Sequence, residues 1–285
     1  MVTKSNYEKK EVNICLSVIV EIMTILGSYR DSIVLIGGWV PYFILDKKGK
    51  DHLGSIDIDL ALDFNKISDQ SYRSILELLK KRGYIQGSQP FIFNRTINTK
   101  DGSTYSIEID LLSGEYGGTS KSHRTQRIQD VNARKARGCD LAFEHNITFS
   151  VKSIMPDGAE NEVSIKVASI VPFLVMKGMA LWDRMKEKDV YDIYFTILHF
   201  PGGINAIAEV FKTVSDNKLV KEGLGKILSK FNGINSVGPT WLVNFLGIED
   251  EGERERIKRD CFERVTTLIK KLGIKEYVTV PSKAS

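Results

Sequence analysis

The sequence predicts an α+β fold, with a mixed β-sheet and flanking helices over residues 1–166 and an all-helical domain over residues 167–285. Short apolar or alternating runs, which are typical of strands, occur only before residue 168. From Ser169 onward the apolar residues recur at helical spacing. The chain has 285 residues, of which 42% are hydrophobic, enough to bury the core of one large or two ordinary domains.

Composition excludes several classes of protein. Seven prolines and 23 glycines are ordinary frequencies, which argues against collagen-like and disordered chains. Cys15, Cys139 and Cys261 form no Cys-x-x-Cys pair, so we expect neither a disulfide framework nor a thiolate zinc site. The sequence has no apolar run of roughly 18 residues, the length that a membrane span needs. We therefore expect a cytoplasmic protein without a membrane partner.

The first half begins with an amphipathic helix. Asn13, Ser17, Glu21 and Thr24 form a polar stripe opposite an apolar stripe over residues 12–26. The elements expected next are a buried strand at 32–36, a glycine turn at 37–38, a helix at 39–45, a polar loop at 46–51, a strand at 56–60 and a helix at 67–82.

Two predicted hairpins and four helices complete the chain. The hairpins pair a strand near 91–93 with 104–111, and 147–154 with 162–167, because turn residues lie between the members of each pair. The periodic segments after residue 169 predict helices at 170–199, 204–214, 219–231 and 251–272.

Acidic residues alternate with apolar ones on two predicted strands. Asp57 and Asp59 project from one face of the strand at 56–60, since alternate residues share a face. Asp110 joins them if the strand at 104–111 is a neighbour. Like charges held together need a compensating cation, and three carboxylates suit magnesium. The alternative is that these acids cover the solvent face of an antiparallel sheet.

Glycines stand upstream of these acids. Gly37 and Gly38 lie between a buried strand and a predicted helix start, where free backbone N–H groups can bind phosphate. A glycine turn followed by two acidic strands indicates metal-dependent phosphoryl transfer.

Two further segments are rich in charge. On a continuous helix, Lys177, Arg184, Lys188 and Asp192 would share one face and overlook a cleft, where the cations would neutralise a triphosphate. Residues 121–137 carry a net charge of +5, from six Lys and Arg against one Asp, in a chain of net charge +4. This basic run predicts a polyanion contact. For both segments the alternative is a solvated surface.

The glycine and acid motifs resemble the nucleotidyltransferase superfamily, which has the DNA polymerase β-like fold. The matching residues are Gly37-Gly38, Ser55-Ile56-Asp57-Ile58-Asp59 and Ile109-Asp110. The resemblance implies that the glycine turn and Ser55 bind the nucleotide. It also implies that Asp57, Asp59 and Asp110 are catalytic and hold two magnesium ions, which manganese could replace.

The charged segment at 177–192 resembles the AbiEii/AbiGii family, which includes the MenT-like toxins of type IV toxin–antitoxin systems. The family motif is matched by Lys177, Arg184, Lys188, Asp189 and Asp192, and the likeness covers residues 33–197. It implies catalytic roles for Lys177, at the phosphates, and for Asp189, as an active-site acid, with Arg184, Lys188 and Asp192 supporting the substrate site.

The resemblance implies transfer of a nucleoside monophosphate from an NTP to a hydroxyl. The basic run makes RNA, and by resemblance the tRNA 3′ end, the expected acceptor; an antitoxin would be the partner of such a toxin in phage defence. A small-molecule or protein acceptor stays open. A noncatalytic nucleotide- or RNA-binding module is the competing hypothesis, which Trp39 favours because nucleotidyltransferases usually place a serine or another small residue at this position.

Overall fold

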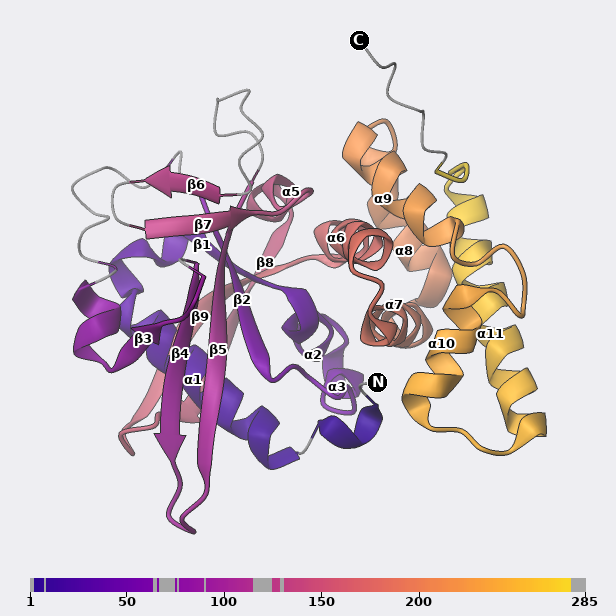
Figure 1. Ribbon diagram of the computed structural model, residues 1–285. Coiled ribbons are helices and arrows are strands. Elements are labelled where there is room, and N and C mark those ends of the chain that lie inside the picture. Colours follow the sequence, from indigo (N-terminus) through magenta and orange to yellow (C-terminus); the bar gives the residue numbers. More distant parts are fainter. Residues whose placement is uncertain are drawn as a thin grey trace. The chain divides into compact units, whose positions relative to one another are not determined.

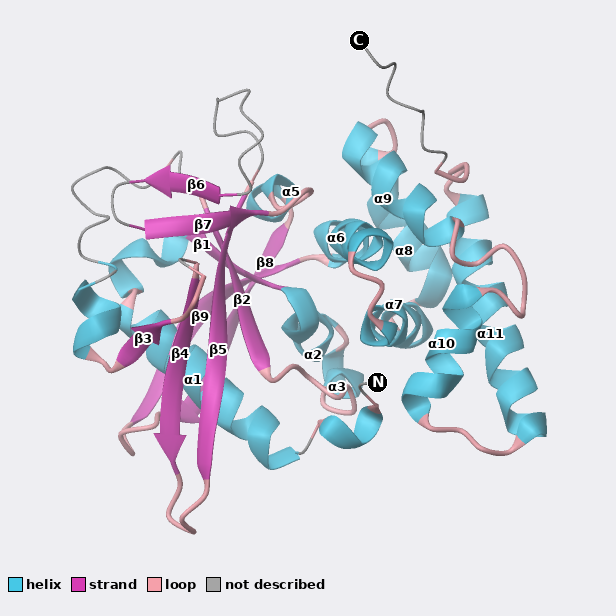
Figure 2. Ribbon diagram, in the orientation of Figure 1, coloured by secondary structure: helices cyan, strands magenta, loops and turns pink. Residues whose placement is uncertain are grey.

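The computed structural model in Figures 1 and 2 describes residues 3–7, 9–63, 66, 75, 77–89, 91–114, 125–128 and 131–277. It confirms the α+β class, with a mixed sheet followed by an all-helical region. The chain divides into two compact units, one of residues 5–173 and one of residues 174–285 with 1–4. Strand β9 (Glu160–Ala168) runs past the predicted domain boundary at 166, which stays a prediction.

The N-terminal unit is built on a mixed sheet of strand order β3-β4-β5-β2-β1-β9-β8, with β7 added beside β5 and β6 paired to β7. Strand β2 is antiparallel to β1 and parallel to β5. The remaining strands are β1 (Ile33–Ile36), β2 (Asp57–Leu62), β3 (Tyr84–Gln86), β4 (Ile92–Asn98), β5 (Thr104–Ser113), β6 (Thr125–Ile128), β7 (Val131–Lys135) and β8 (Asn146–Ile154). The central strands are therefore the two that carry the predicted acids and the one that leads into the glycine turn.

Helices flank this sheet. Helix α1 (Lys9–Ile25) packs on β8 and β9 through its apolar stripe. A 3-10 turn, η3 (Gly37–Trp39), follows β1 and leads into α2 (Val40–Ile44). Further short helices are η1 (Lys4–Asn6), η2 (Gly27–Ser32), α3 (Asp46–Gly49) and α5 (Asp140–Glu144). The prediction of a loop at 46–51 is therefore wrong for residues 46–49, which form α3.

Several predictions on this unit can be compared directly. The strands expected at 32–36, 56–60 and 104–111 and the hairpin of β8 with β9 are confirmed. Strand β3 was not predicted. The helix expected at 67–82 lies largely outside the described residues, apart from helical residues 75 and 77–81. Within the basic run, residues 121–124 and 129–130 lie outside the described part, and β6 and β7 supply the backbone of most of the rest.

Glu21 was predicted to lie on the polar stripe of α1, and this was wrong. The side chain is 1% exposed. Its carboxylate accepts hydrogen bonds from Arg95 Nε at 2.9 Å, from Arg95 Nη2 at 3.1 Å and from the Tyr84 hydroxyl at 2.8 Å. A buried charge is tolerated when it is paired and hydrogen-bonded, and these partners come from strands far along the chain.

Helices alone form the described part of the C-terminal unit. They are α6 (Ile170–Asp183, which begins at the end of the N-terminal unit), α7 (Glu187–His199), α8 (Gly203–Phe211), η4 (Lys212–Val214), α9 (Lys218–Leu228), α10 (Val237–Leu246) and α11 (Glu251–Lys271). Helix α10 was not predicted. Helices α8, α10 and α11 pack against α7. In the described part of the chain no helix combines the length and apolar character of a membrane span, and Cys15, Cys139 and Cys261 are buried free thiols.

The continuous helix predicted over 170–199 is wrong, because the chain breaks between α6 and α7. Met185 has φ +53°, outside the helical region, and Lys186 is extended. In one straight helix Lys177 and Asp189 would be separated by about 18 Å along the axis. With the break, their charged atoms lie 2.8 Å apart. The break therefore lets Lys177 of α6 pair with Asp189 of α7.

Candidate functional site

The acidic residues of β2 and β5 lie side by side. In the parallel pairing of these strands, Asp57 is opposite Glu108 and Asp59 is opposite Asp110. Opposed residues on neighbouring strands project to the same face, so four carboxylates share one surface. The alternating residues Ile58, Leu60, Ile109 and Leu111 are fully buried on the other face. The two acidic strands are neighbours, which is the condition under which Asp110 joins Asp57 and Asp59.

The glycine turn packs directly against this surface. Gly37 has φ +71°, and a Cβ added there would lie 1.9 Å from Asp59 Oδ2. Only a residue without a side chain therefore leaves room for the Asp59 carboxylate. The helix predicted after the turn is α2, which has only five residues. The predicted phosphate contact is therefore assigned to the backbone amides of the turn and not to a helix terminus. Phosphate binding by Gly37 and Gly38 stays a prediction.

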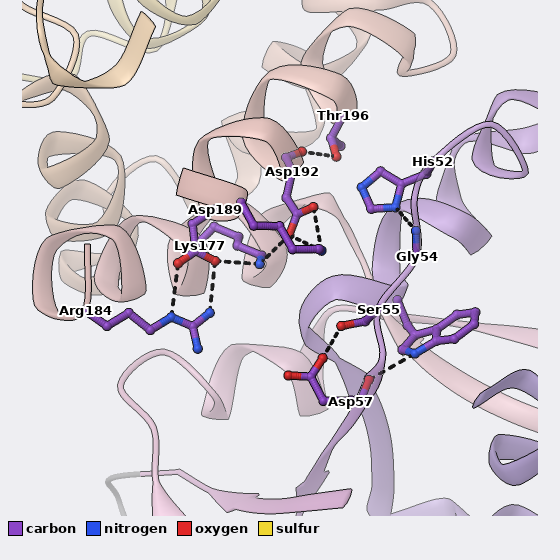
Figure 3. A network of polar contacts seen from close by, with 11 residues as sticks. His52, Gly54, Ser55, Asp57, Lys177, Arg184, Asp189, Asp192 and Thr196 are labelled. Atoms are coloured by element: carbon purple, nitrogen blue, oxygen red, sulfur yellow. Dashed lines mark hydrogen bonds and ion pairs between the residues drawn. The ribbon is translucent and has the colours of Figure 1, made fainter. Parts of the chain in front are cut away.

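Asp57 is held by two hydrogen bonds from its own unit, as Figure 3 shows. The Ser55 hydroxyl donates a hydrogen bond to the Asp57 carboxylate. The Trp39 indole Nε1 donates to the Asp57 carbonyl oxygen at 3.1 Å. Glu108 is its neighbour on β5. Because Trp39 is fully buried, its ring belongs to the core rather than to a surface pocket.

Sequence reasoning missed a turn and two acids near this surface. His52 is buried, and its Nδ1 accepts a hydrogen bond from the Gly54 amide at 3.0 Å, which shapes the turn before β2. Asp140 packs against Gly114 at the end of β5, since a Cβ on that glycine would lie 1.7 Å from Asp140 Oδ1. Asp63 forms an ion pair with Lys66 at 3.0 Å. The Asp140–Gly114 contact joins segments that are far apart in the sequence, and the two local contacts carry no recognised motif.

The carboxylates fit a divalent cation in chemistry and in backbone placement. Carboxylate oxygens are preferred ligands of Mg²⁺, and Asp57, Asp59 and Asp110 occupy adjacent positions on two paired strands. Among the described residues, no three His, Cys, Asp or Glu side chains are gathered around one point. The metal assignment stays a prediction.

The charged residues of the segment at 177–192 form a cluster of ion pairs within the C-terminal unit (Figure 3). Lys177 Nζ donates to Asp189 Oδ1 at 2.8 Å and to Asp192 Oδ2 at 2.6 Å. The Arg184 guanidinium binds both carboxylate oxygens of Asp189, at 2.9 and 3.0 Å. Lys188 Nζ donates to Asp192 at 3.0 and 3.1 Å. The three cations and two anions, which we call the Lys177 cluster, leave one net positive charge.

Burial of the Lys177 cluster corrects the prediction of an open charged face. Lys177, Asp189 and Asp192 are 6%, 1% and 0% exposed, so they cannot form a solvated surface. The Arg184 side chain is 42% exposed and can still meet a ligand. Lys177, Asp189 and Asp192 are therefore buried as charges that pair with one another.

The ionisation of the cluster follows from its pairing. Burial lowers the pKa of Lys177, but the Asp189 and Asp192 carboxylates raise it more, so the pKa lies above its ordinary value of 10.5. Burial raises the pKa of Asp189, but the Lys177 ammonium and the Arg184 guanidinium lower it further, so it lies below 3.8. Both groups are therefore charged near neutral pH, where Asp189 cannot donate a proton.

These pKa directions predict how stability depends on pH. The Asp189 contribution is present above pH 3.8 and is lost as the pH falls through the lowered pKa; that of Lys177 is present below pH 10.5 and is lost as the pH rises through the raised pKa. We expect Asp189→Asn to cost unfolding free energy at pH 7 and to cost less at pH 3. Urea unfolding of both proteins at the two pH values measures this, and an equal cost at both would contradict it.

The residues predicted for one site divide between the two compact units. The glycines, Ser55 and the acids of β2 and β5 belong to the N-terminal unit, and the Lys177 cluster belongs to the C-terminal unit.

Comparison with known proteins gives distant structural likenesses. Neither protein-family models nor curated proteins match the sequence. The crystal structure of JHP933 from Helicobacter pylori is similar at 16% identity, covering 93% of this chain and 94% of that chain with a TM-score of 0.46. An antigenic nucleotidyltransferase-like protein from Paracoccidioides brasiliensis is 16% identical, covering 78% and 89% of the two chains with a TM-score of 0.43. At these values the function has to be argued from the residues of this chain.

Proposed function

We propose that this protein is a magnesium-dependent nucleotidyltransferase that moves a nucleoside monophosphate from an NTP to a hydroxyl group. The observation that carries the proposal is the register of β2 and β5, which sets Asp59 beside Asp110 while Gly37 leaves space for the Asp59 carboxylate. Acids on paired strands with a glycine turn against them are what a metal-bound triphosphate requires.

Each group of residues has a distinct task in this proposal. Asp57, Asp59 and Asp110 would hold Mg²⁺, or Mn²⁺ in its place, and the metal would stabilise charge on the attacking and leaving oxygens. Backbone amides of Gly37 and Gly38 would bind phosphate, and Ser55 orients the Asp57 carboxylate. The Lys177 cluster, with one net positive charge, would bind the triphosphate through the accessible guanidinium of Arg184.

RNA is the acceptor that we propose, with the tRNA 3′ end as the first to test. Strand β7, which belongs to the basic run at 121–137, pairs with β5 at Leu112 and Ser113, just beyond Asp110. A basic segment next to the acids would bind the phosphates of an acceptor strand. The finer proposal is a toxin of the AbiEii kind, acting in phage defence and neutralised by a cognate antitoxin.

The noncatalytic alternative rests on Trp39, which stands where nucleotidyltransferases usually place a serine or another small residue. Trp39 is fully buried and donates a hydrogen bond to the Asp57 carbonyl oxygen, so its ring lies in the core. A binding module would still keep the glycine turn and the cluster. The two hypotheses differ in whether a covalent nucleotide appears on an acceptor.

Label transfer tests the proposal. Each of the four NTPs, labelled at the α-phosphate, is incubated with total tRNA, magnesium and either the wild-type protein or Asp57→Ala. We expect one NTP to label tRNA and the variant to retain less than about 1% of the activity, because a ligand rather than a supporting residue is lost. Asp51→Ala, which removes an exposed aspartate, is the matched control and should keep full activity.

The outcomes separate the alternatives. Label on a protein or a small molecule instead of tRNA would replace the acceptor and keep the reaction. Nucleotide binding without transfer to any acceptor would support the noncatalytic module. Equal transfer by wild type and Asp57→Ala would contradict the metal site.

A further inference from the structure

The backbone around Asp57 lacks a strand partner on one side. Strand β1 ends at Ile36, which is opposite Asp59 in the antiparallel pairing with β2. Asp57 lies two residues earlier on β2, beyond the last paired residue of β1. The chain leaves the sheet there as the turn η3. On the other side Asp57 has a regular neighbour, Glu108 of β5.

The Trp39 side chain fills the place of the missing partner. Its indole N–H donates to the Asp57 carbonyl oxygen at 3.1 Å, which satisfies an acceptor that β1 no longer reaches. The ring is 0% exposed, and Tyr42 packs against it edge to face at a centroid distance of 5.5 Å. A buried ring fixed by its neighbours is a rigid donor, so the carbonyl that it binds is fixed too.

The same turn contacts both acids of β2. Gly37, at its start, packs against the Asp59 carboxylate, and Trp39, at its end, binds the Asp57 backbone. Ser55, two residues before Asp57, donates a hydrogen bond that orients the Asp57 carboxylate. Strand β2 sets the spacing of the two carboxylates, and this three-residue turn contacts both residues that carry them.

We propose that Trp39 is a positioning residue for the metal site, in that its indole N–H fixes the backbone of Asp57 and thereby the direction of its carboxylate. The proposal rests on the proposed function, since it concerns the same acids. It assigns a role to the residue that stands where nucleotidyltransferases usually place a serine. Trp39 acts through Asp57 and touches neither metal nor nucleotide.

Manganese affinity is the measurement that tests this proposal without relying on activity. Mn²⁺ is titrated into the full-length protein, and free Mn²⁺ is followed by electron paramagnetic resonance. Trp39→Phe keeps the aromatic ring and removes the N–H. We expect it to bind Mn²⁺ about tenfold more weakly than wild type, the size of effect typical for a residue that orients a metal ligand.

Two further variants separate positioning from folding. Benzothienylalanine introduced at position 39 keeps the size of the indole and replaces the N–H by sulfur, so it should weaken Mn²⁺ binding as Trp39→Phe does while leaving the core filled. Trp241→Phe makes the same exchange on α10, in the C-terminal unit, and should leave Mn²⁺ affinity unchanged.

The result for the wild type and the result for the variants answer different questions. Tight binding by wild type, its loss in Asp57→Ala and about tenfold weakening in both position-39 variants would support the proposal. Wild-type affinity in the benzothienylalanine protein would overturn the role of Trp39 and leave the metal site intact. Absence of Mn²⁺ binding by wild type would overturn the proposed function, and with it this inference.

Discussion

Lys177→Met lowers the free energy of unfolding of the C-terminal unit by about 3–5 kcal/mol, the range for breaking a buried ion pair by removing one partner. Methionine retains most of the side-chain volume but removes the ammonium that binds Asp189 and Asp192. Both aspartates would stay buried, and Arg184 and Lys188 would each have to compensate one of them alone. Urea denaturation followed by circular dichroism measures the loss.

Matched variants separate pairing from packing. Lys212→Met makes the same exchange at a surface pair whose side chains are both mostly exposed, and it should cost less than about 1 kcal/mol. Adding Asp192→Asn to Lys177→Met removes one of the stranded charges and should recover part of the lost stability. A cost below 1 kcal/mol for Lys177→Met, or no recovery in the double variant, would contradict the role of the cluster in holding the unit together.

Gly37→Ala has the second large effect, because it disturbs backbone and site together. The φ of +71° disfavours any L side chain, and the new methyl group would meet the Asp59 carboxylate. We expect a loss of about 2–4 kcal/mol in unfolding free energy. The displaced Asp59 should also weaken Mn²⁺ binding and nucleotidyl transfer by at least about tenfold.

Two comparisons isolate the contact with Asp59 from the backbone term. Gly158 has φ +88° in the hairpin between β8 and β9, with nothing within 4 Å of an added Cβ, so Gly158→Ala measures the backbone cost alone. In an Asp59→Ala background the carboxylate is gone and only the Cβ of residue 59, at 3.0 Å, remains close to the added methyl group, so Gly37→Ala should cost less than it does in the wild-type background. Equal costs for Gly37→Ala and Gly158→Ala in the wild-type background would show that the turn and the acid do not interact.

Local patterns were sufficient for the two acidic strands and for the face that each one presents. Strict alternation in residues 56–60 and 104–111 determined which side chains share a face, because the side-chain period of a strand is fixed at two. Gly37 and Gly38 were identified because a buried strand, a glycine turn and a helix start in sequence present free backbone N–H groups to phosphate. These predictions depend on neighbouring residues only, and the structure confirms the strands.

Long-range partners decided the rest. Helical spacing correctly identified the apolar residues of the last third, but it could not reveal the break at Met185, which turns Asp189 and Asp192 back onto Lys177. Likewise, the sequence predicted that Glu21 lies on a polar stripe. In the structure Glu21 is buried, because Arg95 and Tyr84 bind its carboxylate. The sequence by itself determined the fold class, the shared face of Asp57 and Asp59, and the charged motif, whereas the pairing that brings Asp110 beside Asp59 came from the structure. Only the tertiary structure decided which charges are buried, since burial depends on partners that lie far apart in the chain.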